Sequence, residues 1–272
     1  MFDENPTSIQ EASPGTNAIP LVLMHDGGGT TFDYHFLDDL ERDVWGIHNP
    51  RFNSGEPWIG GLAEMSTHYI ELIKKVIPSG PVILGGWSLG GMLALEMARQ
   101  LVDDPEIDVK GMVMVDTIYP FQAPGQDKKF VAQYKPTFNS YTSAATQKSV
   151  TASFANTFEM LKTWKIPEWN ETADIVPPPT ALIRVEESVP VPADADKDTV
   201  MRVDVHRQRR LLGWELYDYH LIDAVTEITG HHYTPFKPEN VELTSEKIKV
   251  ACSMIQRRVL KKARDESSVK QF

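Results

Sequence analysis

The strongest chemical signal in the chain is a serine, Ser88, in the sequence GWSLG at residues 86–90. An apolar, β-branched run at 82–84 precedes it, and a helix-forming run at 92–100 follows it. A strand, G-x-S-x-G and a helix in this order are typical of a nucleophile elbow, a sharp turn that exposes a reactive serine. The flanking glycines leave room where the strand and helix backbones crowd together. The alternative is a glycine-rich turn that ends a buried strand. A catalytic role for Ser88 is favoured only if the chain also supplies a base and an acid to activate it.

A reactive serine needs a base within hydrogen-bond reach and a third group that orients the base. The chain has eight histidines, and two of them, His231 and His232, directly follow a predicted late strand at 224–228. The carboxyl ends of parallel strands meet at one edge of a sheet, so a histidine in this loop returns to the edge that carries Ser88. The other histidines are better explained as loop or helix-surface residues.

Two strand ends offer the third group, a carboxylate. Asp116 ends a predicted strand at 109–115, and Glu186 and Glu187 end the next one at 180–185. Both positions lie at the same edge of the sheet. The residue types do not choose between them, because a carboxylate there also serves as a helix cap or a solvated loop residue. Serine, then acid, then histidine is the chain order of α/β-hydrolases.

A glycine-rich loop, HDGGGT at residues 25–30, follows the first predicted strand at 19–24. Backbone N–H groups at such a junction point toward an anion. A phosphate loop is one interpretation, but the G-K-[ST] ending is missing and the glycines are not spaced as G-x-G-x-x-G. Because an elbow follows downstream, a loop that stabilises an oxyanion is favoured. His25 and Asp26 are interpreted as residues that shape this loop rather than as catalysts.

Strand-like and helix-like runs alternate along the chain, which predicts an α/β fold with a mainly parallel sheet covered on both faces. We expect one domain over residues 19–264, preceded by a polar, flexible leader or linker at 1–18 and followed by a frayed, charged tail at 265–272. The polar segment at about 121–178, with scattered aromatic residues, predicts a helical lid over the site. A peripheral helical subdomain without a gating role is the alternative for this segment.

Composition excludes several classes of function. The net charge of −11 argues against nucleic acid and against an anionic membrane surface, since both attract clustered Lys and Arg. The single cysteine, Cys252, rules out an internal disulfide and is interpreted as a small core residue of a helix. The N-terminus has no signal-peptide pattern, and no apolar run approaches the length of a membrane span. A cytoplasmic location is expected.

Four segments carry a resemblance to a known family: HDGGG at 25–29, GGWSLGG at 85–91, VMVD at 113–116 and GHHYTPF at 230–236. Together they resemble the thioesterase domains of polyketide and nonribosomal peptide synthetases, especially the fungal ones. The resemblance runs from about residue 21 to about residue 258 and weakens through the predicted lid. It implies an α/β-hydrolase fold, in a free-standing enzyme or in the terminal domain of a synthase.

The resemblance also implies a role for each matching residue. It makes Ser88 the nucleophile, Asp116 the acid and His232, in the Gly-x-His-aromatic pattern, the base. The backbone N–H of Leu89 and that of Gly27 would form the oxyanion hole. Substrate contacts are expected from Trp87, which either walls the acyl pocket or packs beneath the elbow, and from Asp26.

The implied activity is release of an acyl chain, a polyketide or a peptide, from a carrier-protein phosphopantetheine thioester through an acyl-serine intermediate. Release would proceed by hydrolysis or cyclisation. The implied partner is an acyl or peptidyl carrier protein, whose phosphopantetheine arm presents the substrate; no cofactor of its own and no metal are expected. The rival interpretations are an oxygen-ester or lactone hydrolase with the same triad, and a non-catalytic protein that binds a carrier or a ligand.

Overall fold

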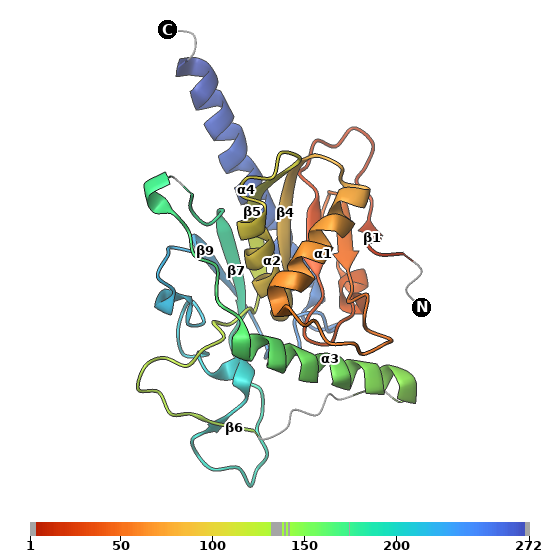
Figure 1. The fold of residues 1–272 in the computed structure, drawn as a ribbon, viewed down its shortest axis with the longest axis vertical. Coiled ribbons are helices and arrows are strands. Elements are labelled where there is room, and N and C mark those ends of the chain that lie inside the picture. The colour runs from red at the N-terminus through yellow and green to blue at the C-terminus, as the bar shows by residue number, and fades with distance from the viewer. Residues whose placement is uncertain (1–3, 132–137, 139, 141, 174, 270–272) are drawn as a thin grey trace.

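A computed structural model describes residues 4–131, 138, 140, 142–173 and 175–269. Their main sheet is twisted and lies between layers of helices (Figure 1). Within these residues, seven strands make the main sheet in the order β1-β3-β2-β4-β5-β7-β9. Neighbouring strands are parallel except for the pair of β1 and β3. The strands are β1 (Thr7–Gln10), β2 (Leu21–Met24), β3 (Val44–Ile47), β4 (Gly80–Trp87), β5 (Ile107–Val115), β7 (Thr180–Val185) and β9 (Ala224–Ile228). The predicted α/β class and mainly parallel sheet are confirmed.

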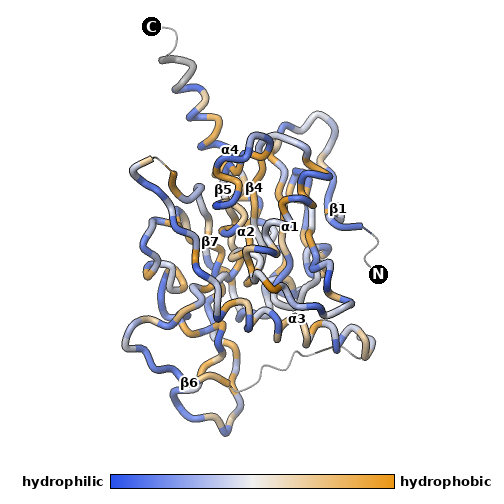
Figure 2. The backbone as a smooth tube through the Cα atoms, viewed as in Figure 1, coloured by the Kyte–Doolittle hydropathy of each residue, from blue (hydrophilic) through white to orange (hydrophobic). Residues whose placement is uncertain are grey.

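Helices cover both faces of this sheet because alternate strand residues point to opposite sides. Val22 and Met24 of β2 join the core beneath two helices, whereas Leu21 and Leu23 join the core beneath a third. Those helices are α1 (Gly61–Val76) and α2 (Leu89–Gln100) on the first face and α4 (Val241–Val269) on the second. Figure 2 shows hydrophobic residues along the central strands and more hydrophilic ones in the outer loops. Cys252 is fully buried in the α4 core, as predicted.

The N-terminal segment is not a loose leader along its whole length, because β1 adds an antiparallel edge strand to the sheet. The Gln10 side chain bonds the loop before β3: its amide donates to the carbonyl oxygens of Leu37 and Asp38 at 3.0 and 2.9 Å, and its oxygen accepts from Leu40 N at 2.9 Å. Edge pairing of this kind depends on backbone and side-chain hydrogen bonds and needs no apolar run. The hydrophobic pattern therefore gave no signal for it.

The charged C-terminal segment and the segment after the glycine loop are both helical, over very different lengths. The tail expected to fray instead continues α4 as far as Val269, and Figure 1 shows its last turns extending beyond the rest of the fold. Lys, Arg, Glu and Ala have good helix propensity, so a charged end does not by itself stop a helix. The glycine loop is followed by a short 3₁₀ turn, η1 (Phe32–Phe36).

The predicted lid contains one long helix, α3 (Ala144–Thr163), which lies across the carboxyl end of the sheet in Figure 1. It contacts the glycine loop, where the Phe154 ring faces the Gly27 backbone and the Thr157 hydroxyl donates to the Gly27 carbonyl oxygen at 3.4 Å. The same segment holds a two-residue strand that the pattern did not predict, β6 (Lys129–Phe130), paired with β8 (Thr199–Val200). Residues 132–137, 139, 141 and 174 of the predicted lid lie outside the described residues.

The helix after the elbow lies close to the sheet, and its glycines make this approach possible. A Cβ on Gly90 would overlap the carbonyl oxygen of Met24, and one on Gly86 would lie 2.5 Å from the same oxygen. A Cβ on Gly91 would overlap the hydroxyl of Thr117. The glycines of the G-x-S-x-G pattern are therefore required by backbone packing, as the sequence predicted.

We expect Gly90→Ala to lower the free energy of unfolding by about 1–3 kcal/mol, the usual cost of overpacking. Helix propensity alone predicts the opposite sign, a gain of up to about 1 kcal/mol. Denaturant unfolding of the variant decides between the two. The control is Lys75→Ala on the exposed face of α1, which should change stability by less than about 0.5 kcal/mol. An unchanged or raised stability of Gly90→Ala would contradict the packing argument.

Candidate active site

Ser88 forms the turn between β4 and α2, with φ 56° and ψ −114°. Left-handed backbone costs about 1–2 kcal/mol in a residue other than glycine, so the surroundings must hold this turn. Two hydrogen bonds do so: Ser88 N–H donates to the Val115 carbonyl oxygen at 2.9 Å, and the Thr117 hydroxyl donates to the Ser88 carbonyl oxygen at 3.0 Å. Val115 is the last residue of β5, and Thr117 lies two residues beyond it. The elbow is therefore fastened to the strand that carries the candidate acid.

The structure brings Ser88, His232 and Asp116 into one hydrogen-bonded chain. The Nε2 atom of His232 lies 3.0 Å from Ser88 Oγ, and its Nδ1 atom lies 2.7 Å from Asp116 Oδ2. His232 and Asp116 are buried and Ser88 is half-buried, so the serine is the end of the chain that meets solvent. With Nδ1–H donated to the carboxylate, Nε2 is left to accept the serine proton, which is the arrangement of an activated nucleophile.

Asp116, rather than Glu186 or Glu187, reaches the histidine. Both glutamates are exposed, and the structure uses their backbone N–H groups to pair with the β9 end of the sheet. Burial would raise the pKa of the Asp116 carboxyl, but hydrogen bonds from Arg207 and His232 outweigh it and hold the pKa below its usual range. Asp116 is therefore ionised throughout the neutral pH range.

Trp87 packs beneath the elbow and supports the histidine loop. Its side chain is 7% exposed, and its indole Nε1–H donates to the His232 carbonyl oxygen at 3.0 Å. Its ring lies 5.7 Å from the His232 ring and 5.5 Å from that of Phe236, centroid to centroid. Of the two roles considered for Trp87, these contacts favour the one beneath the elbow. His231 is half-buried beside the loop and does not join the hydrogen-bonded chain.

The glycine loop has the shaping residues that the sequence predicted. Asp26 Oδ1 accepts a hydrogen bond from Gly28 N–H at 3.0 Å, and His25 Nε2 lies 2.7 Å from the Tyr69 hydroxyl. Burial lowers the pKa of His25 to about 4, so the ring is neutral at pH 7. Burial, with a contribution from the charge of Asp33, raises the pKa of Asp26 to about 7. Asp26 thus fixes the loop through Gly28, and His25 joins it to Tyr69 of α1, on either side of the Gly27 backbone.

Sequence reasoning missed Arg207, because a cluster of arginines at positions 207, 209 and 210 is typical of a solvated charged face. Arg210 is exposed and Arg209 is half-buried, but the Arg207 side chain is only 2% exposed and bonds Asp116. The buried neighbours Asp204 and Val205 share its segment. The alternation of polar and apolar residues around position 207 was the one available signal, and it is weak because no periodic helix or strand surrounds it.

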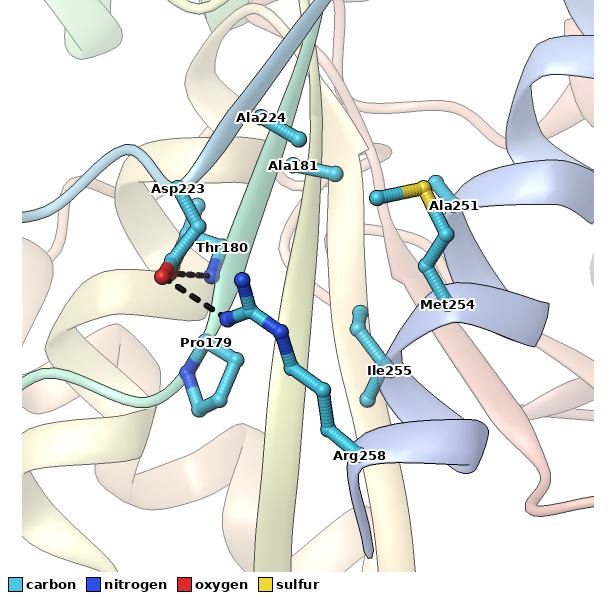
Figure 3. Close-up of a pocket in the computed structure, with 9 residues that line it drawn as sticks. All are labelled: Pro179, Thr180, Ala181, Asp223, Ala224, Ala251, Met254, Ile255 and Arg258. Carbon is cyan, nitrogen blue, oxygen red and sulfur yellow. Dashed lines mark hydrogen bonds and ion pairs between the residues drawn. The ribbon is translucent and has the colours of Figure 1, made fainter. Parts of the chain in front are cut away.

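Hollows lined by other described residues lie apart from Ser88, His232 and Asp116. The pocket in Figure 3 lies at the amino ends of β7 and β9, where Asp223 accepts from Thr180 N at 2.9 Å and from Arg258 Nη1 at 2.7 Å. Through these two hydrogen bonds, Asp223 joins α4 to the sheet at the edge opposite the elbow. A second hollow of about 340 Å³ lies beside the end of α3, lined by aromatic residues that include Tyr119, Trp164 and Tyr217. No cluster of metal-ligating side chains and no helix long and apolar enough to cross a membrane occurs among the described residues.

A mainly parallel sheet with a strand–serine turn–helix elbow at its carboxyl edge defines the α/β-hydrolase class of fold. Comparison with known proteins then identifies the family. The family model for the thioesterase domain matches residues 19–162, and the chain belongs to this family. It is therefore an enzyme of the thioesterase type of hydrolase.

Related proteins agree with this assignment. The chain is 35% identical over 266 residues to thioesterase frbE of Dothideomycetidae sp. (strain 11243), covering 94% of this chain and 98% of the relative. It is 34% identical to part of the nonribosomal peptide synthetase imqB of Aspergillus flavus, with 94% of this chain matching 8% of that protein. The NocB thioesterase domain from the nocardicin cluster has the same fold, with a TM-score of 0.64, 23% identity and coverage of 92% and 99% of the two chains.

Substitution of each candidate carboxylate, Asp116, Glu186 and Glu187, tests which one orients the histidine. We expect Asp116→Asn to lower kcat by about 10³–10⁴-fold, since an amide stabilises the wrong histidine tautomer and not the imidazolium. Glu186→Gln and Glu187→Gln are the matched controls and should retain activity within about twofold, because neither side chain is buried. Steady-state kinetics on protein shown to be folded by circular dichroism checks this. Full activity in Asp116→Asn would exclude Asp116 as the acid.

Proposed function

We propose that this chain is a serine-dependent thioesterase that releases an acyl chain, a polyketide or a peptide, from the phosphopantetheine arm of a carrier protein. The observation that carries the proposal is the chain of hydrogen bonds from Ser88 through His232 to Asp116, at 3.0 and 2.7 Å. It occurs at an elbow in a member of the thioesterase family. Neither the elbow nor the family membership alone would give the serine this role.

In the first half-reaction, His232 Nε2 takes the proton of Ser88 as Oγ attacks the thioester carbonyl carbon. Asp116 orients the imidazole and stabilises its protonated form. The tetrahedral intermediate collapses, the carbon–sulfur bond breaks, and the proton on His232 passes to the leaving thiolate. The acyl group is then an ester of Ser88, and the carrier leaves with a free thiol.

In the second half-reaction, a nucleophile replaces the serine. Water, or a hydroxyl, amine or carbon nucleophile of the acyl chain itself, loses a proton to His232 and attacks the ester carbon. The serine leaves with that proton, which restores the starting state. Water gives a free acid, whereas an internal nucleophile gives a ring. The balance depends on how far the closed site excludes water.

The oxyanion of both tetrahedral intermediates needs backbone donors. Leu89 is the first residue of α2, where an N–H has no partner within the helix. Its position directly after the nucleophile and at the positive end of the helix makes it the first donor. Gly27, held between the sheet and Phe154 of α3, is proposed as the second. Removal of one such donor typically costs 10²–10³-fold in kcat.

A carrier-bound substrate is supported by relatedness to a nonribosomal peptide synthetase, imqB, over nearly the whole of this chain. In such an enzyme the acyl chain travels on a phosphopantetheine arm, so the carrier brings the prosthetic group and the thioesterase needs no cofactor of its own. The proposed partner is an acyl or peptidyl carrier protein or domain. The scattered aromatic residues of the predicted lid segment at about 121–178 favour an apolar or aromatic acyl chain.

Turnover of matched substrates tests the proposed function. We expect hydrolysis of an acyl-N-acetylcysteamine thioester to be faster than that of the corresponding oxygen ester, and Ser88→Ala to lower the rate by at least about 10³-fold. Intact-mass measurement should detect one acyl group on the wild type and none on Ser88→Ala. Ser79→Ala, at an exposed serine before β4, is the matched control and should behave as the wild type.

The other outcomes identify the rivals. Faster turnover of the oxygen ester, with the same dependence on Ser88, would indicate an oxygen-ester or lactone hydrolase. Absence of turnover, together with absence of Ser88 labelling by a fluorophosphonate, would indicate a non-catalytic binding protein. Equal thioester turnover by the wild type and Ser88→Ala would show that the serine mechanism is wrong.

A further inference from the structure

The carboxylate of the candidate acid is bound at two points by a buried arginine. Arg207 Nη1 donates to Asp116 Oδ1 and Arg207 Nη2 donates to Asp116 Oδ2, each at 2.7 Å. The two side chains are 2% and 0% exposed. Two parallel, charge-assisted hydrogen bonds to a carboxylate fix its orientation as well as its charge. Arg207 makes this contact from a segment far from β5 in the sequence.

The remaining hydrogen-bonding positions of Asp116 are also filled. Oδ1 accepts from the Val185 N–H at 3.0 Å, and Oδ2 interacts with His232 Nδ1 at 2.7 Å. A carboxylate has about four lone-pair sites, so these four contacts use its full capacity. Asp116 itself has a left-handed backbone, with φ 44°. Its carboxylate cannot rotate about its own axis without breaking several strong bonds at once.

Arg207 is itself held in place. Its Nε donates to Asp204 Oδ1 at 2.9 Å, and Nη1 donates to the Val185 carbonyl oxygen at 3.0 Å. Its segment is tied to the loop after Asp116, where Trp214 Nε1 donates to the Thr117 carbonyl oxygen at 2.8 Å. The guanidinium is thus preorganised before any substrate arrives.

A buried ion pair is weak evidence of stability, because removing both charges from water costs about as much as their attraction returns. Retention of a charged, two-point partner behind a catalytic acid therefore calls for another explanation. The geometry supplies one, since the oxygen that faces His232 is the same Oδ2 that Arg207 Nη2 holds.

We infer that Arg207, braced by Asp204, is a positioning residue of the triad: it fixes the carboxylate of Asp116 against His232, and the Asp204–Arg207 pair sets the net charge that the imidazole faces. This inference deepens the proposed function and rests on it. Hydrogen bonds would then run from Asp204 through Arg207, Asp116 and His232 to Ser88.

Removal of Arg207 and removal of Asp204 should have opposite effects on the stability of the protonated His232 imidazole. Arg207 offsets one negative charge next to His232, so its removal would stabilise the protonated imidazole. Asp204 supplies a negative charge behind Arg207, so its removal would destabilise the protonated imidazole. Other charged groups of the adjoining elements are Arg184, whose Nη2 donates to the Arg207 carbonyl oxygen at 2.7 Å, and its ion-pair partner Glu227. Both remain constant in the experiment.

His206 also adjoins this network, and it is occupied elsewhere. Its Nε2 lies 2.6 Å from the Phe121 carbonyl oxygen. Burial lowers the pKa of His206, so the ring is neutral above pH 7 and adds no charge there. The charge that faces His232 in this range comes from Asp116, Arg207 and Asp204.

Three variants test the inference by kcat, KM and the pH profile of kcat/KM, each per active site counted by fluorophosphonate titration. Arg207→Gln should lower kcat by about 10²-fold with KM nearly unchanged, as expected when a catalytic group is displaced. Its acidic limb should move to higher pH, since that limb reports protonation of the essential base. Arg207→Lys keeps the charge but loses the two-point contact, so kcat should fall while the limb stays near its wild-type position. Asp204→Asn keeps an acceptor for Nε and should move the limb to lower pH.

The control is Arg209→Gln, which removes a partly exposed ion pair with Glu215 in the same segment and should match the wild type. Arg207→Gln leaves a buried carboxylate without its charged partner, so this variant can unfold. If it does, Arg207→Lys and Asp204→Asn test the inference. Wild-type kcat per titrated site in Arg207→Lys, with no shift of the limb in Asp204→Asn, would overturn the inference and leave Arg207 a purely structural residue.

The rate constant for fluorophosphonate labelling of Ser88 separates this inference from the proposed function. That reaction depends on the triad but not on a thioester. If the wild type is labelled rapidly but turns over no thioester, the proposed function fails, and the labelling rates of the Arg207 variants still test the positioning role. If thioester turnover is present and the labelling rates of the variants equal that of the wild type, the positioning role fails alone.

Discussion

The buried carboxylate of Asp116 is the point on which the rest of the site depends. An ionised acid with no solvent exposure is stable only if every lone pair has a donor, and here the donors come from three separate parts of the chain. Val185 belongs to β7, Arg207 to the segment before β9, and His232 to the loop after β9. Because all three segments donate hydrogen bonds to the Asp116 carboxylate, they meet at one place, beside Ser88.

A parallel sheet makes that gathering possible, because the carboxyl ends of its strands meet at one edge. β4 delivers Ser88, β5 delivers Asp116, β7 delivers the Val185 N–H, and β9 leads into the loop of His232. The strained backbone of Ser88 and of Asp116, with φ values of 56° and 44°, is held by packing of glycines against carbonyl oxygens and by hydrogen bonds between the β4 and β5 ends. Strain at the site is thus supported by the most buried part of the fold.

The sequence predicted the parts whose signals are local. Apolar runs at 180–185 and 224–228 coincide with β7 and β9, and the glycine pattern around Ser88 located the elbow. The residue types narrowed the candidate acid to two strand ends, the family resemblance pointed to Asp116, and the 2.7 Å contact between Asp116 Oδ2 and His232 Nδ1 agrees with that choice. Arg207 could not be predicted, because its burial depends on a loop that folds back onto β5 without any periodic pattern. The edge strand β1 was missed for a related reason: its pairing depends on backbone hydrogen bonds, which leave no hydrophobic signature.

The long helix of the predicted lid, α3, and the residue that follows it contact both the glycine loop and the elbow helix. Near its middle, α3 packs Phe154 against Gly27 of the glycine loop. After its end, Trp164 Nε1 donates to Glu96 of α2 at 2.8 Å, a buried hydrogen bond to the helix whose first residue is Leu89. The two proposed oxyanion donors, Gly27 and Leu89, therefore belong to a loop that α3 contacts and to a helix that Trp164, directly after α3, contacts. Displacement of α3 together with Trp164 would therefore disturb the contacts of both.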